Sequence, residues 1–346
     1  MSEYSKYVIP AVIVLAVLTS FFIIKPFLIS LITGAIIAYT FNPLYKLVNR
    51  RITSKSVAAF LVSVFILALV TIPAIVIVNT ISREAYVLYV QGKELLLSGN
   101  LRTLCRTELC YSLENWFNID QVQRSIQQSL EVGTEYLRKQ ATGFFLTLPR
   151  RTLEIFIVIV ATFYLMRDGD KVREAVKKLL STNHARQKFI FQRFNSVMHG
   201  VVYGSLLVAF VQGVAGTIGF AIFGVSSPLT WGVVMFFLAL IPYIGTGLIW
   251  VPASLLLIIN GLAIGPSILV WKGVGLFLYG ALFISTIDNL IKPYVIGDRI
   301  RIHPLLVMIG IFGGLALMGI PGIIVGPVVL AMSLTLLNLY VDHEKG

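Results

Sequence analysis

LALIPYIGTGLIWVPASLLLIIN, residues 238–260, is apolar enough to lie in a lipid bilayer, yet it contains residues that interrupt a helix. These residues are Pro242, Gly245, Gly247 and Pro252. Proline lacks a backbone donor, and glycine adopts turn conformations at low cost. Because unpaired backbone groups in lipid cost several kcal/mol each, such interruptions occur where they are buried in protein or line a watery cavity. The stretch therefore predicts a broken membrane helix.

The composition of the whole chain is typical of a membrane protein. Of its 346 residues, 57% are hydrophobic and 13% are charged, which is about half the charged share of soluble domains. Several apolar runs approach or exceed the roughly 20 residues that a spanning helix needs, so we expect an all-α, polytopic transmembrane bundle. No small-residue cleavage site follows the first run, which favours a retained helix over a signal peptide. The runs are 8–24, 27–44, 57–78, 146–166, 201–225 and 267–287, with longer, interrupted runs at 229–259 and 305–340.

The two interrupted runs have lengths that do not suit simple spans. Residues 229–259 would measure about 46 Å as one helix, against a hydrocarbon core of about 30 Å. This is too long for one span and too short for two, so we expect two re-entrant helical hairpins, each broken within the membrane. A continuous, tilted helix with a proline kink is the alternative. In the second run the interrupting residues are Gly313, Gly314, Gly319, Pro321, Gly322, Gly326 and Pro327.

The charges indicate which loops face the cytoplasm. Of the 28 lysines and arginines, many gather in two segments, 46–55 and 167–193. Basic loops stay on the cytoplasmic side, so we expect an inner-membrane protein with both termini in the cytoplasm. The two hairpins then enter from opposite faces, with turns that meet near the midplane, as in transporters that use alternating access. Aromatic residues interleaved with a folded basic domain are missing, which argues against a nucleic-acid partner despite the net charge of +12.

Three parts of the chain follow from this topology. Residues 1–79 contain the first three membrane helices, 80–146 form a helical extracytoplasmic insertion, and 147–346 form the transport core. Within the core, 168–195 predicts cytoplasmic amphipathic helices, with Val172 and Val176 on one apolar face and a possible cap at Asn183. A linker helix that packs on its own protein is the alternative to one that lies on lipid.

The chain has two cysteines, Cys105 and Cys110, and both lie in the predicted extracytoplasmic segment. An oxidising compartment permits a disulfide between them, and two free thiols are the alternative. Two thiolates without a nearby histidine fall short of the four ligands of a structural zinc site. We therefore expect neither a metal nor a cofactor.

Four separated motifs carry a family resemblance: FYLMRDGDKV, ALIPYIGTGLIWVPA, DNLIKPYVIGDRIRIHPLLVMI and GGLALMGIPGIIVGPVVLA. In this order and spacing they resemble the autoinducer-2 exporter family. The resemblance implies a bundle of seven or eight membrane segments with an oligomeric tendency. It also implies export of the furanone autoinducer-2 or, for some members, Na⁺(Li⁺)/H⁺ exchange. The family's turns and motifs are similar to Pro242–Gly245, Asp288–Asn289 with Pro293, His303–Pro304, and Gly319 with Gly322.

Asp288 is the first candidate for ion coupling, because ionisable groups at membrane depth are costly and often functional. Asn289, Lys292 and Pro293 complete this candidate site, and an interfacial Asp288 that pairs with Lys292 or caps a turn is the alternative. The candidate pathway residues are Pro242, Tyr243, Gly245, Gly247, Pro252, Gly313, Gly314, Gly319, Pro321, Gly322 and Pro327. Polar side chains that can bind a small polyol, or else satisfy neighbouring helices, are Gln212, Ser254, Asn260 and Asn289.

The function classes that remain are membrane ones. The sequence contains no H-E-x-x-H and no G-x-S-x-G motif, so we expect no enzyme. It contains no Walker motif either, so active transport would use an ion gradient such as H⁺ or Na⁺. We expect a homo-oligomeric secondary exporter of a small solute. An antiporter is the first alternative, and a passive pore or scaffold, whose flux would not depend on Asp288, is the second.

Overall fold

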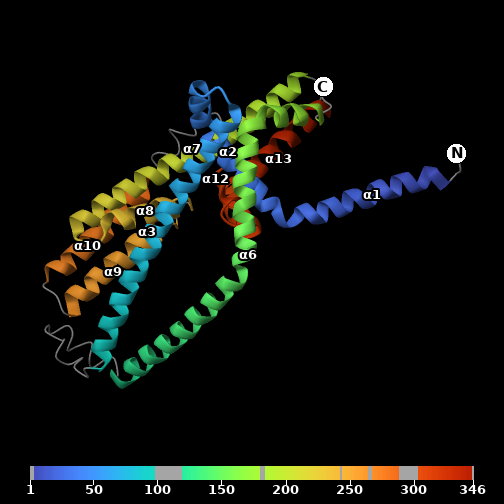
Figure 1. The fold of residues 1–346 in the computed structure, drawn as a ribbon. Coiled ribbons are helices and arrows are strands. Elements are labelled where there is room, and N and C mark those ends of the chain that lie inside the picture. Colours follow the sequence, from blue (N-terminus) through green and yellow to red (C-terminus); the bar gives the residue numbers. More distant parts are fainter. Residues whose placement is uncertain are drawn as a thin grey trace.

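The computed structural model describes residues 4–97, 119–179, 184–241, 244–263, 267–287 and 303–344. These ranges form α-helices joined by short turns, with no strand among them, which confirms the all-α prediction for this part of the chain. Figure 1 shows most of the helices gathered into one elongated group, from which α1 (Tyr4–Ile24) extends away. Cys105 and Cys110 lie outside the described residues.

Two of the N-terminal helices, α2 and α3, pack on α6. The 3₁₀ turn η1 (Lys25–Phe27) joins α1 to α2 (Leu28–Arg51), and α3 (Lys55–Leu97) follows after a short turn. Helix α6 (Ile119–Leu179) packs on both α2 and α3. Tyr45, Val62, Ile66 and Met166 are buried in the core among them. Packing thus groups the fourth apolar run with the first helices.

Helix α6 and α7 (His184–Phe223) share the segment 168–195. Asp168 has non-helical backbone angles, φ −114° and ψ 16°, so α6 is kinked there and continues to Leu179. The second expected amphipathic segment is the start of α7, which runs without a break into the fifth apolar run. No proline lies between His184 and Phe223, so no proline interrupts the helix where the amphipathic segment meets the fifth apolar run. Asn183 lies outside the described residues.

The interrupted run 229–259 is divided into two helices, α8 (Pro228–Leu238) and α9 (Gly247–Ala263). Helix α8 packs mainly on α7, and α9 packs mainly on α10 (Ile268–Tyr279), whose last turns form the π-helix η2 (Gly280–Ile284). The break is where the prolines and glycines place it, but the two halves pair with their neighbours more than with each other. Phe220, Met235, Trp250 and Leu276 form the core of this group.

The second interrupted run is a close hairpin of α12 (Pro304–Met318) and α13 (Gly322–Glu344). A Cβ added to Gly314 would overlap the carbonyl of Gly322, and one added to Gly326 would overlap the carbonyl of Gly310. The two backbones approach this closely because neither side carries a side chain. Helix α13 packs on α7, through Val197 and Val202 of α7 and Val328 of α13.

By length and composition, four helical stretches of the described chain can cross a membrane: residues 8–51, 55–80, 184–223 and 268–287. Shorter apolar helices are α8, α9, α12 and α13. Helix α6 is not among the four, because Arg150, Arg151 and Glu154 at one end and Arg167 and Asp168 at the other limit its uncharged apolar stretch to 155–166. The apolar helices are compatible with a multi-pass membrane bundle, and the re-entrant course of the two hairpins stays a prediction.

Candidate functional site

The break between α8 and α9 is locally well bonded. Gly245 and Thr246 are buried, and a Cβ on Gly245 would overlap the carbonyl of Leu238, so only glycine fits there. The Gly245 amide donates to the Ile241 carbonyl at 3.0 Å, and the Trp250 amide donates to the Thr246 carbonyl at 3.2 Å. Gly247 begins α9. Pro242 and Tyr243 lie outside the described residues.

Pro252 lies inside α9 and interrupts its hydrogen bonding. Because proline has no N–H, the Leu248 carbonyl four residues earlier loses its usual helical partner. Beside Pro252 and Leu248 lies a cavity of about 680 Å³. A volume of this size is typical of sites for small molecules. The sequence-predicted Pro252 therefore lines a cavity, which is one of the two surroundings in which an interrupted membrane helix is tolerated.

The cavity lies where three helices and one turn come together. Its wall on the α9 side is apolar, with Leu248, Ile249, Ala253, Leu256 and Leu257, and Asn260 at the end. Its polar side comes from α3, from the turn between α7 and α8, and from α8, through Thr80, Arg83, Gly224, Ser226, Ser227 and Trp231. An apolar wall facing a few polar groups suits a small, partly polar solute.

The charge around the cavity is positive. Arg83 is the charged side chain in its lining, as far as the described residues go. Lys272 of α10 approaches the same turn, since its Nζ lies 3.3 Å from where a Cβ on Gly224 would be. Gly224 and Ser227 have φ of 78° and 50°, and these left-handed residues fold the turn tightly between α7 and α8. The cavity therefore favours neutral or anionic solutes over metal cations.

Of the three polar candidates that the structure describes, Gln212, Ser254 and Asn260, only Asn260 lines the cavity. The Ser254 hydroxyl donates to the Val251 carbonyl of its own helix at 2.7 Å, which is the structural alternative considered for it. Gln212 is 1% exposed, and its Nε2 donates to the Ile284 carbonyl at the π turn at 3.1 Å. Its Oε1 is buried and has no partner among the described residues. Asn289 lies outside them.

The second set of predicted pathway residues lies in the α12–α13 hairpin. Gly319 has φ 69° and ψ −149° and forms the turn with Pro321, and its amide donates to the Leu315 carbonyl at 2.9 Å. Gly314 and Gly322 meet across the hairpin, and Pro327 lies against Gly310, while no atom lies within 4 Å of a Cβ placed on Gly313. This hairpin packs on α7, whereas α9 packs mainly on α10, so the main packing of the described helices places the two sets on different neighbours. The predicted approach of the Pro242 turn to the Pro321 turn stays a prediction.

The candidate ion-coupling residues Asp288, Asn289, Lys292 and Pro293 all lie outside the described part of the chain. The described helix ends one residue earlier, at Ile287, which is three residues after the π-helix Gly280–Ile284. π-helical turns often mark functional sites. Sequence reasoning missed this turn, and the two glycines near it, Gly275 and Gly280, were the available signal.

The charged motif after the apolar stretch of α6 forms a compact ion-pair group. Asp168 pairs with Arg167 at 2.6 Å and with Lys171 at 2.9 Å. Hydrogen bonds from Lys171 and Arg167 lower the pKa of Asp168 from its ordinary value. Arg167 also lies over the rings of Tyr164 and Phe163, at 4.6 and 5.4 Å from their centroids. This group lies at the kink of α6.

Comparison with known proteins bears directly on this arrangement. The family model described as "AI-2E family transporter" matches residues 11–342. A protein of Aquifex aeolicus named "Putative transport protein" is 24% identical over 310 residues, or 86% of each chain. "Putative transport protein MJ1177" of Methanocaldococcus jannaschii is 24% identical over 355 residues, or 99% of each chain. A "Putative transport protein" of Methanothermobacter thermautotrophicus is 27% identical over 331 residues, or 95% of this chain and 93% of the relative. The resemblance seen in the sequence is confirmed.

Proposed function

Because this chain belongs to the AI-2E transporter family, we propose that it is a secondary exporter of a small, hydroxylated solute of the autoinducer-2 type. The observation that carries this proposal is the cavity beside Pro252, where a broken membrane helix opens onto a wall with hydroxyl and amide groups. An ion gradient drives the transport, with Asp288 as the coupling group. The protein acts as a homo-oligomer in the inner cell membrane, with both termini in the cytoplasm.

Two properties of the cavity support a polar organic solute. Thr80 and Asn260 offer hydrogen bonds, and the leucines of α9 offer an apolar wall for a ring. Groups of both kinds orient a small ligand that has a carbon skeleton and several hydroxyls. Arg83 and Lys272 oppose a cation at this position. A Na⁺(Li⁺)/H⁺ antiporter therefore needs its cation site elsewhere in the chain.

The test is solute-driven proton movement in proteoliposomes that contain the full-length protein and a pH-sensitive dye. Autoinducer-2, Na⁺, Li⁺ and K⁺ are added separately to the native protein and to Ala253→Trp. Since Ala253 lines the cavity, the tryptophan fills it, and we expect solute-driven proton flux to be lost. Ala11→Trp is the matched control, because it places the same side chain on an exposed face of α1.

Each other result points to another function. Proton movement with Na⁺ or Li⁺ and none with the furanone would make the protein an antiporter. Furanone efflux that is independent of the proton gradient and unchanged in Asp288→Asn would make it a passive pore. Equal activity of Ala253→Trp and Ala11→Trp would place the pathway outside the Pro252 cavity.

A further inference from the structure

A second cavity lies on the other half of the molecule, at the corner between α1 and α2. It measures about 400 Å³ and lies between the corner and the part of α6 that follows Pro149. Pro26, Phe27, Pro149 and Leu153 make its wall apolar, and Arg150 and Glu154 supply its charges. None of these residues takes part in the transport cavity at Pro252.

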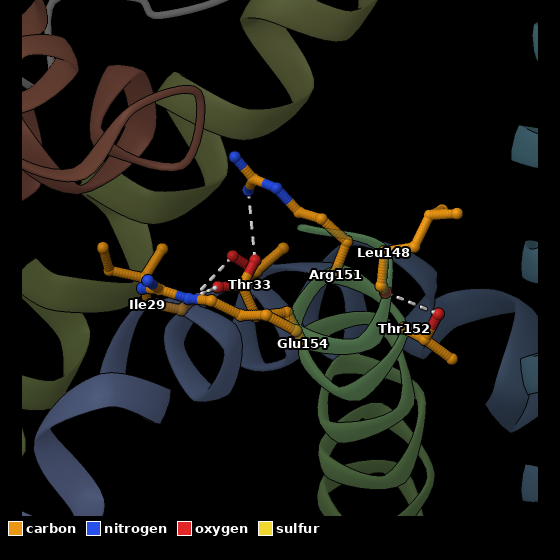
Figure 2. Close-up of polar contacts among 7 residues, drawn as sticks. Ile29, Thr33, Leu148, Arg151, Thr152 and Glu154 are labelled. Carbon is orange, nitrogen blue, oxygen red and sulfur yellow. Dashed lines mark hydrogen bonds and ion pairs between the residues drawn. The ribbon is translucent and has the colours of Figure 1, made fainter. Parts of the chain in front are cut away.

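Positive charges outnumber negative ones at this corner. Glu154 accepts from Arg150 Nε through Oε1 at 3.0 Å and from Arg151 Nη1 through Oε2 at 3.1 Å. Figure 2 shows Arg151 and Glu154 on α6, with Ile29 and Thr33 labelled on α2. Both carboxylate oxygens are thus engaged, while each guanidinium carries five N–H donors and uses one in these bonds. Lys25, adjoining Pro26, adds a third cation, so the group has a formal charge of +2.

The depth of this group on α6 matches a membrane boundary. On α6 the uncharged stretch 155–166 separates Arg151 and Glu154 from Arg167, and the two arginines lie about 24 Å apart along the helix. This is close to the hydrocarbon thickness of about 30 Å. Helix α2 has the same polarity, with Lys25 just before its start and Arg50 and Arg51 at its end. Lys25, Arg150 and Arg151 therefore lie at one end of α2, which we take as one membrane interface, and Arg50 and Arg51 lie at the other end of that helix.

We infer that this corner is a binding site for an anionic phospholipid. Its phosphate lies between Arg150 and Arg151, since planar guanidinium groups match phosphate oxygens in pairs. The first part of an acyl chain lies along Phe27 and Leu153, and the exposed apolar face of α1 continues this surface with Ile23, which is 64% exposed. A free phosphate ion uses the arginines but not the apolar wall. A zwitterionic headgroup leaves the surplus positive charge unbalanced.

The carboxylate of Glu154 allows a lipid site to be distinguished from a structural ion-pair group. In the free protein it accepts from both arginines, so a bound phosphate competes with it and is repelled by it. Removing its charge should therefore strengthen lipid binding. A purely structural ion-pair group would instead lose stability and bind lipid no better.

The experiment measures lipid binding to the purified full-length protein in detergent by native mass spectrometry. Phosphatidylglycerol, phosphatidylcholine and inorganic phosphate are titrated separately. We expect Arg150→Gln/Arg151→Gln to weaken phosphatidylglycerol binding by about 10- to 30-fold, from roughly 1 kcal/mol per basic residue. Arg50→Gln/Arg51→Gln removes the same charge at the opposite interface and should change binding by less than about twofold at this site.

Two single variants complete the test and leave both arginines in place. Glu154→Gln should raise phosphatidylglycerol affinity, and Leu153→Ser should lower it without changing phosphate binding. Equal losses in the two double-arginine variants would show non-specific attraction and overturn the proposal. So would phosphate that competes as well as the lipid, unchanged binding in Leu153→Ser, or weaker binding in Glu154→Gln.

Discussion

The Tyr203 hydroxyl on α7 donates to the Thr40 carbonyl on α2 at 2.9 Å and lies 3.4 Å from the Tyr39 carbonyl. Pro43, inside α2, has no N–H to offer the Tyr39 carbonyl, so a side chain of α7 approaches the backbone where α2 is interrupted. The Tyr39 hydroxyl returns the contact by donating to Asn195 Oδ1 at 3.0 Å. Helix α2 is thus joined to α7 by two tyrosine hydroxyls next to the proline interruption.

Tyr203→Phe should therefore lower the free energy of unfolding by about 1–2 kcal/mol, because it leaves a half-buried carbonyl less well bonded. Chemical unfolding in detergent measures this change. Tyr164→Phe is the control, since no described hydrogen bond involves the Tyr164 hydroxyl. In a Pro43→Ala background, where residue 43 regains its N–H, the cost of Tyr203→Phe should shrink. An unchanged cost there would separate the tyrosine from the proline.

The α12–α13 hairpin permits a test with adjacent glycines. Gly314→Ala places a Cβ against the Gly322 carbonyl and should destabilise the protein by about 2 kcal/mol or more, as overpacking does. Gly313→Ala meets no atom within 4 Å and should stabilise the helix by up to about 1 kcal/mol, because alanine is the better helix former. Thermal unfolding of the two variants in one detergent compares them directly. Equal effects would contradict the close approach.

How far the sequence predicts the fold depends on what kind of residue carries the feature. Prolines and glycines predict the breaks between α8 and α9 and between α12 and α13, because their backbone properties act locally. Which helices then pair is not local, and the pairing of α8 with α7 and of α9 with α10 has no periodic signal in such uniformly apolar segments. Pro252 was predicted as an interrupting residue for the same local reason, and it lies inside α9, where it removes one backbone donor.

Arg83 and Thr80 were missed because both follow the third apolar run and were assigned to the extracytoplasmic segment. In the structure α3 continues through them and brings them to the turn between α7 and α8. Residues that are distant along the chain meet through tertiary packing, which hydropathy does not encode.

The charge of Arg83 in the cavity lining can be tested with Arg83→Gln. In proteoliposomes this variant should transport anionic solutes less well than the native protein and should affect neutral solutes less. Equal effects on both kinds of solute would contradict a role of its charge.

The ion pairs of Asp168, at the kink of α6, should make the stability of the protein sensitive to acid. Lys171 and Arg167 lower the pKa of Asp168, so its ion pairs stabilise the protein above the ordinary value of 3.8. That stability is lost as the pH falls through the lower pKa of the folded protein. Melting temperatures measured from neutral to acidic pH should show an acid-dependent fall that is smaller in Asp168→Asn. Asp170→Asn, which removes a carboxylate without a described ion pair, should keep the native pH profile.

A substitution of Gln212 can distinguish a role in helix packing from a role in transport. Its Nε2 bond to the Ile284 carbonyl and its unpaired Oε1 have opposite effects on stability, so Gln212→Met should change the unfolding free energy by no more than about 1 kcal/mol. An unpaired buried acceptor beside a π turn is costly unless another conformation or a ligand uses it. We therefore expect Gln212→Met to reduce transport in proteoliposomes while the melting temperature stays near native. Ser254→Ala, whose hydroxyl is satisfied within its own helix, should leave both unchanged. Native transport by Gln212→Met would make the amide a packing group that joins α7 to the π-helix η2.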